Sequence, residues 1–215
     1  MHSSKKYHKN IDRIATAYMR LRIRPTQSEL RAYNTTRRVL LSFDDYADEK
    51  RIDSLLEILK NYKVKAIFFA VGKWAEENPG IIDKIINDGH WLGNHTFSHA
   101  NLKQLTKEQI ANELERNRTN IKLLRPPQGL YDSRVRKIAN NLGYKIAFWS
   151  IDTKDWRGIN SETILERTVP NLQPGSCILL HMGGEHTVES LPLLIESIRG
   201  KDFDLCSAGN ELDPA

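Results

Sequence analysis

The sequence predicts an α/β fold in which a parallel sheet closes into a barrel of fewer than eight strands. Two observations lead to this prediction. After residue 38, short apolar runs alternate with amphipathic segments, and six or seven such βα units imply a parallel sheet with helices outside it. The chain also has only 215 residues, fewer than a full eightfold barrel typically uses. We therefore expect one domain, preceded by a separate N-terminal segment.

The expected elements follow the spacing of apolar residues. Residues 39–43 are mostly apolar, as in a buried strand, and the next apolar residues recur at helical spacing (Ile52, Leu55, Leu56, Leu59). Gly89 and Gly143 each follow a predicted helix, where glycine commonly ends one. Further strands are expected at 66–71, 90–93, 144–151, 176–180 and 203–206, and further helices at 79–87, 106–114, 133–142, 161–169 and 187–198.

The positive charge of the chain is concentrated near its N-terminus. The net charge is +5, but residues 1–38 hold ten Lys or Arg against two acidic residues, whereas the remainder holds 22 basic and 25 acidic residues. We therefore expect a basic arm or linker at 1–36, with one short amphipathic helix at 11–19, and a catalytic domain at 37–215. Because the domain is mildly acidic, nucleic acid is not expected to bind it. The arm is compatible with anionic lipid, wall polymer or nucleic acid, or with no partner.

The apolar segments do not predict a membrane protein. No run of about 18 apolar residues is present to span a bilayer, and the first 20 residues lack the apolar core of a signal peptide. Either the protein is intracellular or its targeting segment is absent from this chain. Cys177 and Cys206 are too few for a disulfide scaffold, so we expect buried free thiols, with a single bridge left open.

Two carboxylates stand where the first predicted strand ends. Asp44 and Asp45 follow the run at 39–43, and neighbouring strand residues point to opposite faces, so the pair can serve two tasks. An isolated Asp-Asp pair is equally typical of a turn or a helix cap. In parallel barrels, however, the chemistry gathers at the C-terminal ends of the strands, which favours the functional interpretation.

Two histidines follow the strand predicted at 90–93. His95 and His99 are four residues apart, so on a helical turn their side chains would be neighbours and would chelate one ion. Such a pair also arises by coincidence or in core packing. Two imidazoles with one carboxylate from the Asp44-Asp45 pair would leave coordination positions open, as in a catalytic metal site.

Three further strand ends carry polar groups. Arg125 and Gln128 lie in a turn stiffened by two prolines, which would aim an arginine and an amide at a site or form a plain rigid turn. Asp155 and Trp156 follow the strand predicted at 144–151. His181 ends the strand predicted at 176–180, where it would be a core residue or, beside a metal, a general acid.

With these five segments in place, the chain resembles the polysaccharide deacetylases of the NodB-homology group, also called carbohydrate esterase family four. The resemblance covers about residues 37–210, with five motifs in order. It implies a distorted (β/α) barrel with about seven strands. It also implies a divalent metal, with zinc expected first and cobalt or another divalent ion as the alternative. It also implies removal of acetyl groups from N-acetylglucosamine polymers, peptidoglycan or chitin-like oligomers, or from acetylated xylan in some members.

The resemblance assigns a role to each residue. It implies that Asp44 is the catalytic base and that Asp45, His95 and His99 bind the metal. It further implies that Arg125 orients Asp44, that Asp155 tunes His181, and that His181 protonates the leaving amine. The backbone amide of Gln128 would join the oxyanion site, and the acetyl methyl group would be received by Trp156 and Leu179. Tyr46 replaces the glycine usual in the family, and it would narrow the groove near the sugar or offer a stacking face. Gln128 replaces a residue that is often aromatic, but its expected role uses the backbone amide and does not depend on the side chain.

Several alternatives remain open at this point. An acetylxylan esterase or a small-amide amidohydrolase would use the same fold, and a non-catalytic carbohydrate-binding relative would need neither a base nor an acid. A nucleic-acid binder would act through residues 1–38. We expect a monomeric polysaccharide deacetylase that works at the cell surface or outside the cell, with its targeting segment absent from this chain, or else in the cytoplasm.

Overall fold

The computed structural model describes residues 37–206. The basic arm predicted at 1–36, its helix at 11–19 and the last nine residues of the predicted domain lie outside the described residues.

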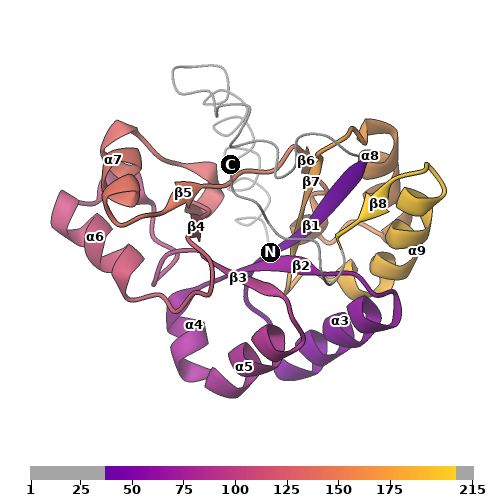
Figure 1. Cartoon of the computed structure of the whole chain (residues 1–215), viewed down its shortest axis with the longest axis horizontal. Coiled ribbons are helices and arrows are strands. Elements are labelled where there is room, and N and C mark those ends of the chain that lie inside the picture. Colours follow the sequence, from indigo (N-terminus) through magenta and orange to yellow (C-terminus); the bar gives the residue numbers. More distant parts are fainter. Residues whose placement is uncertain (1–36, 207–215) are drawn as a thin grey trace, which may run out of the picture.

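A parallel sheet forms the centre of the molecule (Figure 1). Its strands lie in the order β5-β4-β3-β2-β1-β7-β6, and β8 pairs with β1 beside this series. The strands are β1 (Arg38–Asp45), β2 (Ala66–Ala70), β3 (Trp91–Asn94), β4 (Leu123–Leu124), β5 (Lys145–Ile146), β6 (Ile151–Asp152), β7 (Cys177–His181) and β8 (Asp204–Leu205). Every pairing is parallel, as predicted.

The sheet curls into an incomplete barrel. Strands β5 and β6 stand at opposite ends of the strand order, yet only residues 147–150 separate them in the chain. Because the five steps from Ile146 to Ile151 can span at most about 18 Å, the two edges of the sheet must approach each other. The single strand predicted at 144–151 is therefore wrong. The segment is two short strands joined by a link that crosses the open side of the barrel.

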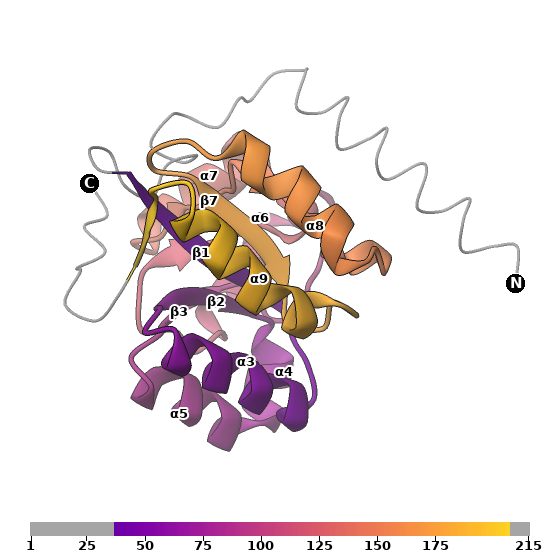
Figure 2. The ribbon, with the colours of Figure 1, turned by 90° about the vertical axis from the view of Figure 1, so that its right-hand side faces the viewer.

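Helices pack around the outside of the curled sheet (Figures 1 and 2). The α-helices are α3 (Glu49–Asn61), α4 (Gly72–Glu77), α5 (Pro79–Asn87), α6 (Lys107–Glu115), α7 (Ser133–Asn141), α8 (Ser161–Thr168) and α9 (Thr187–Arg199). Short 3-10 turns are η1 (Leu102–Gln104), η2 (Pro127–Gly129), η3 (Asp155–Arg157) and η4 (Val169–Asn171). Helix α4 and strand β4 were not predicted from the sequence, while the helices predicted within residues 37–206 are confirmed to within a few residues.

The two faces of β1 separate the apolar core from the site. Leu41 and Phe43 belong to the large cluster formed with the helices, whereas Leu40 belongs to a smaller cluster inside the barrel. By the period of two along a strand, Ser42 and Asp44 share the inward face with Leu40. Both are buried. The interior of the barrel is thus apolar at one end and polar at the end where the strands finish.

Cys177 and Cys206 are free and buried in the cluster inside the barrel, so no bridge joins them. Over residues 37–206, none of the helices combines the length and the apolar character that a membrane crossing requires.

Candidate metal and catalytic site

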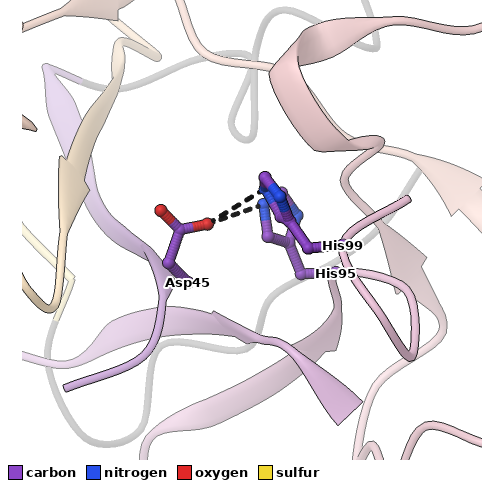
Figure 3. A group of neighbouring side chains, drawn as sticks. All are labelled: Asp45, His95 and His99. Carbon is purple, nitrogen blue, oxygen red and sulfur yellow. Dashed lines mark ion pairs between the residues drawn. The ribbon is translucent and has the colours of Figure 1, made fainter. Parts of the chain in front are cut away.

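Three potential ligands for a metal ion meet at the C-terminal ends of β1 and β3. Asp45 Oδ1 lies 3.3 Å from His95 Nε2 and 3.2 Å from His99 Nε2 (Figure 3). One ligand atom from each residue falls within 4.8 Å of the others. Burial raises the pKa of the Asp45 carboxyl, but hydrogen bonds and charge from the two histidines outweigh it and hold that pKa well below its ordinary value. This donor set fits a divalent catalytic ion.

Irregular backbone conformations at the ends of β1 and β3, rather than regular secondary structure, bring these ligands together. Asp45 has a φ of 75°, which breaks the alternation of β1 and turns its carboxylate toward the histidines. Asp44 also approaches His95, with 3.8 Å between Oδ2 and Nε2, so the expectation that the two carboxylates face apart is wrong. Nor do His95 and His99 share a helical turn. Thr96 and His99 have φ values of 63° and 58°, and the loop between the histidines folds back on itself.

Two buried asparagines hold this loop in its left-handed conformation. Asn94 Oδ1 accepts the Thr96 N–H at 2.8 Å, and Asn94 Nδ2 donates to Leu114 O at 2.8 Å. Asn117 Nδ2 donates to Thr96 O at 3.0 Å and to Ala70 O at 2.9 Å, which ties the loop to the end of β2. Left-handed backbone costs about 1–3 kcal/mol at a non-glycine residue and persists where such contacts enforce it.

Asp44 is paired with a buried arginine. Arg125 Nη1 donates to Asp44 Oδ1 at 2.6 Å and to Ser42 Oγ at 2.9 Å, and the side chain of Arg125 is fully buried. The guanidinium also stacks on the Phe69 ring, with its carbon 4.0 Å from the ring centroid. The backbone oxygen of Arg125 lies 2.7 Å from His95 Nδ1, so it fixes that ring and leaves Nε2 facing Asp45. One residue therefore supports both the candidate base and a candidate ligand.

His181 ends β7 beside Asp44 in the sheet register and is paired with Asp155. Asp155 Oδ1 lies 2.7 Å from His181 Nδ1, and Asp155 is fully buried. Burial alone would lower the pKa of His181. The hydrogen bond and charge of Asp155, with smaller contributions from Asp44 and Asp45, outweigh it and raise that pKa to about 9. The imidazole is therefore protonated at neutral pH, as a general acid requires.

The site thus combines a candidate metal-binding cluster with a carboxylate paired with a cation and an imidazole paired with an anion. The profile of the family described as polysaccharide deacetylase matches residues 31–147. That match covers more than half of the chain, so it decides the family. The chain belongs to the polysaccharide deacetylase family.

Individual relatives agree with this membership. A peptidoglycan-N-acetylglucosamine deacetylase of Bacillus cereus is 35% identical over 175 residues, and the match spans 76% of this chain and 64% of that relative. A chitooligosaccharide deacetylase of Azorhizobium caulinodans is 30% identical over 154 residues, or 67% of this chain and 73% of that protein. A crystal structure of a peptidoglycan N-acetylglucosamine deacetylase, in complex with a substituted benzamide, superposes with a TM-score of 0.78 at 33% identity, covering 83% of this chain and 89% of that one.

A groove of about 1020 Å³ opens beside the candidate metal and catalytic site of this polysaccharide deacetylase. Asp45, His99 and His181 line it, together with the exposed Tyr46 and the half-buried Trp156. It also holds side chains that were not predicted from the sequence, from α4 and from the loops after β3 and β7 (Lys73, Trp74, Glu77, Ser98, Glu185). The α4 residues were missed because that short helix carries no clear apolar period.

Two predicted substrate-binding residues do not line this groove. Gln128 is exposed in η2, with a φ of 58°, and Leu179 is buried on β7 between Cys177 and His181. By the strand period, Leu179 shares the inward face with His181, beneath the groove rather than in its wall. The oxyanion role of the Gln128 backbone amide and the acetyl-binding role of Leu179 stay predictions. Polar groups around Asp155 were also missed, namely Thr153 and Thr187, because isolated threonines in a sequence carry no signal of their partners.

Proposed function

We propose that this protein is a metal-dependent hydrolase that removes acetyl groups from N-acetylglucosamine units of a polysaccharide, either peptidoglycan or chitin-like oligomers. The supporting observation is the opposite pairing of two titratable groups on neighbouring strands. Asp44 is paired with the cation of Arg125, and His181 with the anion of Asp155. Two titratable groups that are paired with opposite charges in this way typically divide the roles of base and acid between them.

The ligand set supports a divalent ion, and we propose zinc. When bound by Asp45, His95 and His99, the ion would polarise the acetyl carbonyl and acidify a water molecule. Asp44 would take a proton from the attacking water as the new C–O bond forms. His181 would give its proton to the sugar nitrogen as the C–N bond breaks, which leaves acetate and a free amine. Asp155 would keep the imidazole oriented and protonated for this transfer.

The groove favours an oligosaccharide over a small amide. Its walls come from β1, α4, η3 and the loops after β3 and β7, so it extends well beyond the space that one acetyl group requires. Tyr46, Trp74 and Trp156 contribute aromatic side chains to it, and such rings commonly pack against the apolar faces of sugars. Both relatives described above carry names of deacetylases of N-acetylated glycans, which supports an amide substrate rather than acetylated xylan.

Acetate release from a panel of substrates tests this proposal. Peptidoglycan, chitooligosaccharides of two to six sugars, acetylxylan and a small N-acetyl amide would be compared on one preparation of known metal content. We expect release from one of the first two, increasing with oligosaccharide length. Release from the small amide alone, or from acetylxylan alone, would overturn the proposal. If peptidoglycan is the substrate, the protein works at the cell surface.

A further inference from the structure

We infer that Thr187 is a positioning residue for His181 and that it acts by holding the carboxylate of Asp155. This inference rests on the proposed function, in which His181 is the acid. Thr187 is the first residue of α9 and is fully buried. Its hydroxyl donates to Asp155 Oδ2 over 2.6 Å. That distance lies in the range of about 2.5–2.7 Å typical of a hydroxyl bonded to an ionised oxygen.

The two oxygens of Asp155 have separate sets of donors. Oδ1 faces the His181 ring nitrogen Nδ1 at 2.7 Å and accepts the Trp156 N–H at 3.0 Å and the Thr153 hydroxyl at 3.1 Å. Oδ2 accepts the backbone N–H of His181 at 2.7 Å and the Thr187 hydroxyl. Thr187 thus supplies the side-chain contact that keeps Oδ2 turned away from the ring, so that Oδ1 stays on it. Because Asp155 is fully buried, bulk water cannot readily replace a lost donor.

The loop between β7 and α9 is shaped for this contact. A Cβ atom at Gly184 would lie 2.1 Å from Thr187 Oγ1 and 2.7 Å from Asp155 Oδ2, so no other residue fits without displacing the pair. The Gly184 N–H donates to His181 O at 3.1 Å, and the Thr187 N–H donates to Gly184 O at 3.3 Å. The chain therefore doubles back after His181 and brings Thr187 against Asp155.

A third element holds this turn in place. Arg51, in the first turn of α3, donates from Nη1 to the Gly184 carbonyl oxygen at 2.5 Å. Arg51 itself is anchored at the start of its helix, where its N–H donates to Asp48 Oδ1. The start of α3 thus holds the loop in which Gly184 packs against Thr187 and Asp155. Such outer contacts orient a functional side chain without touching the substrate.

Thr187→Val and Thr187→Ser form a matched pair that tests the inference. Valine keeps the shape of threonine and lacks the hydroxyl, whereas serine keeps the hydroxyl and lacks the methyl group. In the metal-loaded enzyme we expect Thr187→Val to lower kcat about tenfold with KM and metal content unchanged, the low end of what outer partners contribute. Thr187→Ser should retain most of kcat. Equal losses in both variants, or wild-type kcat in Thr187→Val, would overturn the inference.

A second measurement does not depend on deacetylase activity. In protein labelled on histidine nitrogen, the proton on His181 Nδ1 is assigned by its loss in His181→Gln. We expect its exchange with solvent to be slow in the wild type and in Thr187→Ser, and at least about tenfold faster in Thr187→Val. Unchanged exchange in Thr187→Val would contradict the positioning role. If Thr187→Val does not fold, Thr187→Ala removes the same hydroxyl and is compared with Thr187→Ser in the same way. If no substrate is deacetylated by the wild type, the proposed function fails, and this comparison still decides the role of Thr187.

Discussion

Arg125 and Asp44 form a buried ion pair inside the barrel, with 2.6 Å between Nη1 and Oδ1. They come from β1 and from the turn after β4, and 81 residues separate them in the chain. The guanidinium carbon also lies 4.0 Å from the centroid of the Phe69 ring on β2. The pair therefore links β1, β2 and the turn after β4, and both of its residues contact His95 of the candidate metal site, so it supports both the fold and the site.

Arg125→Ala should destabilise the protein strongly. It would leave the Asp44 carboxylate buried and without its cation, and breaking a buried ion pair in this way costs about 3–5 kcal/mol. Urea unfolding of the metal-free protein measures the loss. Arg118→Ala is the matched control, because Arg118 pairs with Asp83 at 2.8 Å on the exposed surface, where a pair contributes about 1 kcal/mol or less. Similar losses in free energy of unfolding in the two variants would show that the buried pair stabilises the protein no more than the exposed pair does.

Asp44→Asn and His95→Ala should separate proton transfer from metal binding. The Asp44→Asn change keeps the size of the side chain but removes the base, so we expect turnover to fall at least about a hundredfold while the metal stays bound. His95→Ala removes a ligand, and we expect it to lose both metal and turnover. Metal content by elemental analysis and acetate release on the same samples check this. A fully active Asp44→Asn enzyme would contradict its role as base.

Removing the metal should abolish activity without unfolding the protein. The three ligands lie at the rim of a barrel whose large apolar core does not include them. We expect chelation to eliminate acetate release and zinc or cobalt to restore it. Added zinc should also raise Tm, because an ion that binds the folded state alone stabilises it. His95→Ala serves as the control for the Tm shift. Full activity after exhaustive chelation would contradict metal dependence.

The alternation of strands and helices could be predicted because the spacing of apolar residues such as Ile52 and Leu55 indicates which face of an element is buried. The five segments that form the site could be predicted because each carries a polar group at a strand end. The short strands β4, β5 and β6 have two residues each, which is too few for any period to be visible. The sequence pattern therefore predicted one strand over 144–151, in place of β5, the link at 147–150 and β6.

The local geometry of the ligands could not be predicted. Asp45, Thr96 and His99 all have positive φ, and none of them is glycine, the residue that normally signals such a turn. Their conformation is enforced by contacts from distant segments, such as the one from Asn117 to Thr96. The sequence thus predicted which side chains meet, whereas the fold determines how they meet.

Tyr46→Ala should weaken oligosaccharide binding. Tyr46 follows Asp45 directly, lines the groove and is 56% exposed, unlike almost every other large apolar side chain of residues 37–206. If its ring packs against a sugar, losing a contact of about 1 kcal/mol raises KM roughly fivefold with kcat little changed. Tyr46→Phe keeps the ring and should behave like the wild type. An unchanged KM in Tyr46→Ala would show that the ring does not contact the substrate.

The pH dependence of activity should follow the protonation of His181. Its pKa is raised to about 9, so the acid form predominates below that pH, and kcat/KM should fall as pH rises through about 9. Asp155 supplies the largest raising contribution, ahead of the charges of Asp44 and Asp45. In Asp155→Asn the burial of the ring would lower the pKa, and we expect the alkaline limb to move to lower pH. An alkaline limb that stays in place in Asp155→Asn would contradict this account.

The same shift predicts a stability change in the metal-free protein. The folded state binds the proton of His181 more tightly than the unfolded state, whose histidine has an ordinary pKa of about 6.5. The stabilisation is therefore fully present below about pH 6.5 and is lost as pH rises toward 9. Urea unfolding of the wild type and of His181→Gln at pH 6 and pH 9.5 measures it. We expect the difference in free energy of unfolding between the two proteins to shrink at the higher pH, because the wild type alone loses this contribution.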